Sequence, residues 1–299
     1  MKGRIIKHVS GFYYVLCNEE GVDTKDMDVI WKCRGRGIFR KDGQSPLVGD
    51  FVEMEITHRE DEEGVINAIA PRKNQFIRPP VANVDCFVIV VAAAQPKPVP
   101  EVVDRFLVMA EKADTKTVIC ITKTDLDKKN MVATLQEIYS PLYPVVTINN
   151  RTKEGIDPLK KAIAHGVTAL AGPSGVGKST LINNLVEGGK AETGDVSKKT
   201  RRGKNTTRHV ELFPLGKGGM IVDTPGFASL QVMEEEEAQL QRYMPEFRQY
   251  RKDCQYDDCF HLREPNCGVR RALEEGHIAA SRYQSYVNMI EEIRKNRKY

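Results

Sequence analysis

No stretch of the chain approaches the roughly 18 consecutive apolar residues that a membrane-spanning helix requires. Residues 1–7 also begin no long apolar segment of the kind found in signal peptides. The seven cysteines are an odd number, which argues against a disulfide framework and favours a reducing compartment. We therefore expect a cytoplasmic protein with no membrane partner.

The positive and negative charges of the chain nearly balance. A formal net charge of +4 permits an RNA partner but does not require one. With 299 residues, of which 40% are hydrophobic, the chain is long enough to bury a substantial core in two or three domains. No heptad repeat or exposed apolar stripe predicts a dimer, so we expect a monomer.

The most specific motif is Gly-x-x-x-x-Gly-Lys-[Ser/Thr], in residues 172–180. Residues 168–171 are typical of a strand and residues 181–186 of a helix, which is the context this phosphate-binding loop needs. Its glycines let backbone N–H groups surround phosphate oxygens near the positive end of the helix. Lys178 would reach the β- and γ-phosphates, and Ser179 would hold Mg²⁺. The predicted phosphate loop consists of Gly172, Pro173, Ser174, Gly175, Val176, Gly177, Lys178, Ser179 and Thr180.

Two further elements flank this loop in an unusual order. Residues 122–125 have the form [Asn/Thr]-Lys-x-Asp, which looks like the guanine-reading element of a GTPase, with Thr122, Lys123 and Asp125 in its fixed positions. Asp223 and Gly226 define an Asp-x-x-Gly element of the kind that serves Mg²⁺ and the γ-phosphate. Ordinary GTPases carry the base reader after the phosphate loop, whereas here it comes first. The order predicts a circularly permuted GTPase domain that binds GTP or GDP.

The chain pattern predicts three domains. Residues 1–72 contain five short β-rich runs, which are typical of an OB-fold barrel, and the cations in residues 34–41 favour contact with RNA. Residues 73–230 alternate strands and helices, which predicts a doubly wound α/β GTPase domain after a proline-rich linker. Residues 231–299 are predicted to form a small helical domain, in which residues 269–276 and 278–299 are helices.

Between the phosphate loop and Asp223 lies a strongly basic segment, residues 197–208, with six lysines and arginines. We interpret it as an RNA-facing switch whose order depends on the nucleotide. Thr206 or Thr207 is expected to supply a magnesium-binding hydroxyl, and the sequence leaves open which of them does so.

The third domain contains a compact group of metal-ligand residues. Three cysteines and a histidine, the ligand types that tetrahedral Zn²⁺ prefers, occur within fourteen residues. A set of four protein ligands leaves no position open for water, so the metal is expected to be structural. The predicted zinc ligands are Cys254, Cys259, His261 and Cys267.

The permuted order, the Cys-x4-Cys-x-His-x5-Cys pattern and residues 203–211 together resemble the bacterial small-subunit-dependent GTPases of the RsgA/YjeQ family. The resemblance covers the whole chain. It implies a late role in maturation of the 30S ribosomal subunit, contact with ribosomal RNA, and GTP hydrolysis that the subunit stimulates.

Three positions depart from familiar patterns. Thr122 stands where many GTPases carry asparagine, and Asn205 stands where the family usually has histidine. Phe227 follows the Asp-x-x-Gly element where Ras-like proteins carry a water-orienting glutamine, so we expect very slow turnover without a partner. Residues 149–150 replace the usual small pair near the base, and the sequence assigns them no role.

Two other functions are compatible with the phosphate loop. A small-molecule kinase or ATPase would use the same loop, but adenine has no donors for the Asp125 carboxylate to accept. A non-catalytic RNA-binding module would use the barrel and the metal-binding domain and keep the nucleotide as a structural part.

Overall fold

The computed structural model describes residues 1–17, 29–37, 39, 44–77, 80–186, 210–216, 218–222 and 237–296. Four predicted switch residues lie outside these ranges: Thr206, Thr207, Asp223 and Gly226. Asn205 and Phe227 lie outside them as well. None of the helices in the described part of the chain combines the length and the apolar character that crossing a bilayer requires.

The N-terminal residues form a closed five-stranded barrel with the strand order β1-β2-β3-β5-β4. Neighbouring strands are antiparallel except β3 and β5, which run parallel. Alternate side chains point inward, and the buried residues include Ile5, Val15, Trp31 and Ile66. The predicted barrel is confirmed. Its strands are β1 (Lys2–Val9), β2 (Phe12–Cys17), β3 (Val29–Gly35), β4 (Phe51–His58) and β5 (Glu63–Ile69).

The segment expected to be a linker is more ordered than its prolines suggest. It contains a two-stranded ribbon, β6 (Gln75–Ile77) with β7 (Pro80–Ala82). Arg72 forms an ion pair of 2.7 Å with the fully buried Asp50. The Asn83 side chain donates to the carbonyl of Gly49 and accepts from the amide of Lys73. These polar side chains hold the segment against the end of the barrel.

The α/β region contains a six-stranded sheet with the order β10-β9-β8-β11-β13-β12. β9 and β10 pair in parallel, as do β11 and β13, whereas β12 is antiparallel to β13. β8 is buried along its whole length, as expected for a strand covered on both faces. The strands are β8 (Cys86–Ala92), β9 (Lys116–Thr122), β10 (Val145–Ile148), β11 (Gly166–Ala171), β12 (Leu212–Gly216) and β13 (Gly219–Val222). The helices between them are α2 (Pro100–Lys112), α3 (Met131–Tyr139), α4 (Ile156–Ala162) and α5 (Lys178–Leu185).

The residues of the chain group into two compact units. The second unit consists of Phe87–Ala162, Leu170–Leu181 and Phe227–Tyr299. The phosphate loop, the base-reading residues and the four predicted zinc ligands all belong to it. The predicted domain boundaries at residues 72 and 230 stay predictions.

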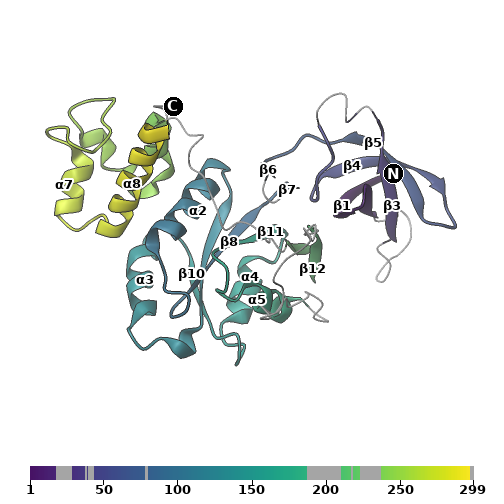
Figure 1. Cartoon of the computed structure of the whole chain (residues 1–299), viewed down its shortest axis with the longest axis horizontal. Helices are drawn as coiled ribbons and strands as arrows, with labels where there is room; N and C mark the ends of the chain where they lie inside the picture. The colour runs from purple at the N-terminus through teal and green to yellow at the C-terminus, as the bar shows by residue number, and fades with distance from the viewer. Residues whose placement is uncertain are drawn as a thin grey trace, which may run out of the picture. The chain divides into compact units, whose positions relative to one another are not determined.

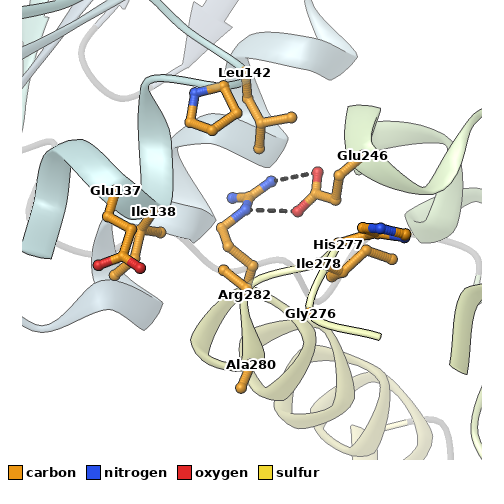
Figure 2. Close-up of a pocket in the computed structure, with 11 residues that line it drawn as sticks. Glu137, Ile138, Leu142, Glu246, Gly276, His277, Ile278, Ala280 and Arg282 are labelled. Carbon is orange, nitrogen blue, oxygen red and sulfur yellow. Dashed lines mark hydrogen bonds and ion pairs between the residues drawn. The ribbon is translucent and has the colours of Figure 1, made fainter. Parts of the chain in front are cut away.

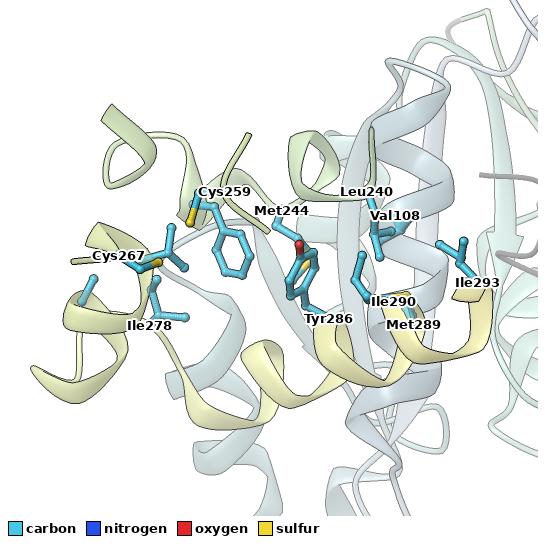
Figure 3. Packing of buried hydrophobic residues seen from close by; sticks show 13 residues of the cluster. Val108, Leu240, Met244, Cys259, Cys267, Ile278, Tyr286, Met289, Ile290 and Ile293 are labelled. Carbon is cyan, nitrogen blue, oxygen red and sulfur yellow. The ribbon is translucent and has the colours of Figure 1, made fainter. Parts of the chain in front are cut away.

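The C-terminal residues form three helices and several 3-10 turns in the described part of the chain, and α8 lies beside α2 (Figure 1). Their core includes Met244, Phe247, Tyr286 and Ile290, together with Val108 from α2 (Figure 3). The two predicted helices of this region are present, with slightly different ends. The elements are α6 (Glu237–Leu240), the 3-10 turns η2 (Gln241–Tyr243), η3 (Pro245–Phe247) and η4 (Arg251–Asp253), and helices α7 (Gly268–Glu274) and α8 (Ala280–Asn296).

A buried ion cluster also joins the C-terminal elements to α2. The Arg282 guanidinium on α8 donates to Asp104 of α2 at 2.9 Å and to both carboxylate oxygens of Glu246 in η3 at 2.7 and 3.0 Å. Figure 2 shows the fork that Arg282 and Glu246 make. The Tyr139 hydroxyl donates to the same Asp104 oxygen at 2.9 Å. A pocket of about 360 Å³ lies beside Arg282, lined by the end of α3 and the turn before α8.

Candidate functional site

The phosphate loop lies between β11 and α5, as the motif predicts. Gly172 has φ of +143°, and a Cβ placed there would lie 2.2 Å from the carbonyl oxygen of Val90. No other residue fits at this position. Lys178 begins α5, and its ammonium donates to the carbonyls of Gly172 and Pro173 at 2.7 Å each. The cation is therefore held over the loop whose N–H groups would surround a phosphate.

The predicted base-reading residues pack directly against this loop, although more than fifty residues separate the contacting positions. Thr122 ends β9, and its hydroxyl donates to the carbonyl of Val176 at 2.6 Å. Lys123 has a left-handed φ of 56°. Its ammonium donates to the carbonyl of Gly175 at 2.7 Å and also to that of Gln95. Both side chains tie the base reader to the phosphate loop.

This geometry explains how threonine can stand at position 122. The hydroxyl is fully buried, and its one proton is shared between the Val176 carbonyl of the phosphate loop at 2.6 Å and the Val91 carbonyl at 3.3 Å. A threonine therefore supplies the structural contact of this position without an amide group. Asp125 follows in the 3-10 turn η1 (Thr124–Leu126), with its carboxylate a quarter exposed.

A third segment, which the sequence assigned no role, adjoins the same place. Ile148 of β10 lies in register with Thr122 of β9, so the residues that follow each strand emerge side by side. The Nδ2 atom of Asn150 lies 3.1 Å from where a Cβ on Gly177 would be. Arg151 reaches Asp125, with 3.6 Å between Nη1 and Oδ2. The signal available in the sequence was the position of residues 149–151 at the carboxyl end of a parallel strand, where ligand sites of such sheets lie.

The structure brings the four predicted zinc ligands together. Their ligand atoms all lie within 4.8 Å of one another. The Cys254 sulfur is 3.8 Å from that of Cys267 and 3.5 Å from Nδ1 of His261, which is 3.4 Å from the Cys267 sulfur. Zn–S bonds of about 2.3 Å and Zn–N bonds of about 2.0 Å at tetrahedral angles give separations of about 3.8 Å between sulfurs and about 3.5 Å between sulfur and nitrogen. The cluster therefore has the size that zinc requires.

Neighbouring groups hold the histidine in the form a metal ligand needs. Nε2 of His261 faces Oε1 of the buried Gln241 at 2.9 Å, so Nε2 carries the proton and Nδ1 keeps its lone pair. The Tyr283 hydroxyl donates to the carbonyl of His261 at 2.7 Å. Burial lowers the pKa of His261 to about 4, which keeps the ring neutral near pH 7. Gln241 was not predicted from the sequence, because no motif marks its position.

The barrel carries cations over an aromatic ring. Lys32 and Arg34 of β3 lie over the ring of Phe12 in β2, at 4.5 and 4.8 Å from its centroid. On β1, Arg4 lies 4.1 Å from the centroid of Phe51, whose side chain is half exposed. Cations next to accessible aromatic rings are the combination that single-stranded nucleic acids bind.

The chain combines a closed five-stranded barrel, an [Asn/Thr]-Lys-x-Asp motif that precedes the phosphate-loop motif, and a Cys3His cluster. This combination is that of a circularly permuted GTPase with accessory domains. Family models reach the same class. The RsgA N-terminal domain matches residues 2–66, and the RsgA GTPase matches residues 69–233. The chain belongs to the RsgA GTPase family and is therefore a GTP hydrolase that binds a guanine nucleotide.

Individual relatives match over the full chain. The small ribosomal subunit biogenesis GTPase RsgA of Alkaliphilus metalliredigens is 45% identical, covering 100% of this chain and 99% of the relative. The protein of the same name from Carboxydothermus hydrogenoformans is 46% identical over 98% of each. Among solved structures, YjeQ from Thermotoga maritima gives a TM-score of 0.82 at 37% identity, covering 98% of both chains. YloQ, described as a circularly permuted GTPase, gives 0.78 at 38% identity, covering 98% of this chain and 95% of its own.

Proposed function

We propose that this protein hydrolyses GTP as a late factor in assembly of the small ribosomal subunit and that the subunit activates the hydrolysis. The observation that carries the proposal is the pair of hydrogen bonds from Thr122 and Lys123 to the phosphate loop, because they place the predicted base reader next to the predicted phosphate site. The relatives named small ribosomal subunit biogenesis GTPases support the subunit as partner.

In this proposal the nucleotide lies across these two adjacent segments. Asp125 accepts the N1 and 2-amino hydrogens of guanine, and the stem of Lys123 covers the base. Residues 172–180 hold the phosphates, with Lys178 offsetting charge on the β–γ bridge. Ser179 and one of the threonines at 206 and 207 are the proposed ligands of Mg²⁺, which supplies charge neutralisation at the phosphates.

The proposed role of the switch residues rests on the sequence alone. Asp223 serves the magnesium side and the Gly226 N–H the γ-phosphate. Phe227 cannot orient a water molecule, so the missing catalytic contribution comes from the ribosomal partner. A contribution supplied in trans is worth about 10³–10⁵ in rate.

We also propose that the Cys3His cluster holds one structural zinc ion. The support is the agreement between the observed ligand spacing and the tetrahedral geometry of zinc. With all four ligands supplied by the chain, the metal stabilises the C-terminal elements and has no part in hydrolysis.

The proposed contact with ribosomal RNA uses the barrel. Phe51, which is half exposed beside Arg4, offers a stacking surface, and Lys32 and Arg34 over Phe12 add positive charge. In this role we propose a cytoplasmic monomer.

The test is GTP hydrolysis by the purified full-length protein, alone and with small ribosomal subunits. Large subunits and ATP are the controls. Very slow turnover alone and strong stimulation by small subunits only are expected. Fast turnover without RNA, or equal stimulation by large subunits, would refute the ribosome-activated mechanism. Equal competition by ATP and GTP would refute the assignment of the base reader.

A further inference from the structure

Two side chains of opposite charge form the open edge of the proposed base pocket. Asp125 follows β9 and Arg151 follows β10, and the register of Thr122 with Ile148 brings the two loops together. Nη1 of Arg151 lies 3.6 Å from Oδ2 of Asp125. The aspartate side chain is 25% exposed and the arginine side chain 81% exposed, so the pair faces outward and is open to a ligand.

The loop that presents Arg151 is built with a fixed turn. The Asn149 side-chain oxygen accepts the backbone N–H groups of Arg151 and Thr152 at 3.0 and 3.3 Å. The loop then returns to the strand, because Asn149 and Glu154 form a backbone bridge. At Gly155 a Cβ would lie 2.0 Å from the carbonyl of Thr147, so only glycine allows this return. The backbone of Arg151 is thus held in place while its side chain stays accessible.

Together the pair presents guanidinium donors beside carboxylate acceptors. The hydrogen-bonding edge of guanine presents the complement: the 6-oxo acceptor beside the N1–H and 2-amino donors. Adenine presents an amino donor and an unprotonated ring nitrogen at the same positions. The amino group would face the guanidinium donors, and the ring nitrogen would face the carboxylate acceptors. Xanthine has a carbonyl in place of the 2-amino group, which would face the carboxylate.

We propose that Arg151 determines base specificity by donating to the 6-oxo group of guanine, while Asp125 accepts from N1–H and the 2-amino group. The inference rests on the proposed role of Asp125 and adds a second reader to it. A carboxylate has about four lone-pair sites, so Asp125 can accept the base without releasing Arg151. Arg151 supplies a base contact that Thr122 cannot make, because its hydroxyl proton is shared between the Val176 and Val91 carbonyls.

The test combines side-chain and base changes. The affinities of the full-length protein for GDP, for IDP, which has no 2-amino group, and for 6-thio-GDP, whose sulfur is a poor acceptor, are measured by calorimetry. Arg151→Ala is expected to weaken the binding of GDP and of IDP by the same factor, about tenfold for one charge-assisted hydrogen bond. The same substitution should change the affinity for 6-thio-GDP little. Arg151→Lys keeps a donor and should recover part of the loss. Lys153→Ala removes an exposed cation from the same loop and is the matched control, expected to bind all three nucleotides as the unaltered protein does.

Other outcomes overturn the inference in distinct ways. Tighter GDP binding by Arg151→Ala would mean that Arg151 only masks Asp125. An equal loss for all three nucleotides would mean that Arg151 only shapes the loop. If the unaltered protein binds no GDP, the proposed function fails, and this inference fails with it.

Discussion

Replacing Arg282 by methionine should loosen the attachment of the C-terminal elements to α2. The Arg282 side chain is 1% exposed, and its partners Asp104 and Glu246 are 0% and 6% exposed. Methionine keeps the apolar stem but leaves two carboxylates buried without their cation. Breaking a buried ion cluster in this way costs about 3–5 kcal/mol, a large share of the stability of a typical domain.

The loss should depend on pH in a known direction. Burial raises the pKa of Asp104 even with Arg282 beside it, and removal of the guanidinium should raise it further. A carboxyl group whose pKa is higher in the folded state contributes stability below its unfolded pKa and loses that contribution as pH rises through the folded pKa. Arg282→Met should therefore be less damaging at about pH 5 than at about pH 8.

Hydrogen exchange of the full chain measures this locally, with the barrel strands as the internal reference. The matched control is Arg294→Met on the same helix, because Arg294 pairs with Glu237 while 47% exposed. An exposed pair is worth about 0–1 kcal/mol. Equal protection of α8 in the two variants would refute the reasoning. A triple variant that replaces Arg282, Asp104 and Glu246 by apolar residues should recover most of the protection, because it leaves no buried charge.

Two further predictions concern the two sites. Gly172→Ala should abolish GDP binding in a calorimetric titration, because the new methyl group would collide with the Val90 carbonyl. The control is Gly37→Ala, whose methyl group would meet nothing within 4 Å, so this variant should bind GDP as the unaltered protein does. Gln241→Leu should weaken zinc binding about 10–100-fold in competition with a chelator, because His261 loses the partner that fixes its tautomer. Unchanged zinc affinity would show that Gln241 does not support the metal.

The sequence predicted those parts of the molecule that are encoded over a short distance. The residues predicted for the phosphate loop and for the base reader each lie within nine positions, because that chemistry needs glycine, lysine and aspartate at fixed spacing. Their roles in nucleotide binding stay predictions. The buried role of Arg282 was not predicted, because its partners lie in α2 and in the turn η3, far from it in the sequence, and an arginine on a helix is usually solvated. Asp104 did carry a signal, since it interrupts the apolar face of α2 formed by residues such as Val103 and Leu107. A charged residue on an apolar face indicates a buried ion pair, but it does not reveal that Arg282 is the partner of Asp104.

The core contact that α2 makes has a consequence during protein synthesis. Asp104 and Val108 emerge from the ribosome long before α8, and 178 residues separate Asp104 from Arg282. Until α8 arrives, the nascent α/β region exposes a valine and a carboxylate that belong to a core not yet made. A chain that stops before residue 280 would keep this surface open, and it would be a natural site for chaperones and proteases to recognise incomplete molecules.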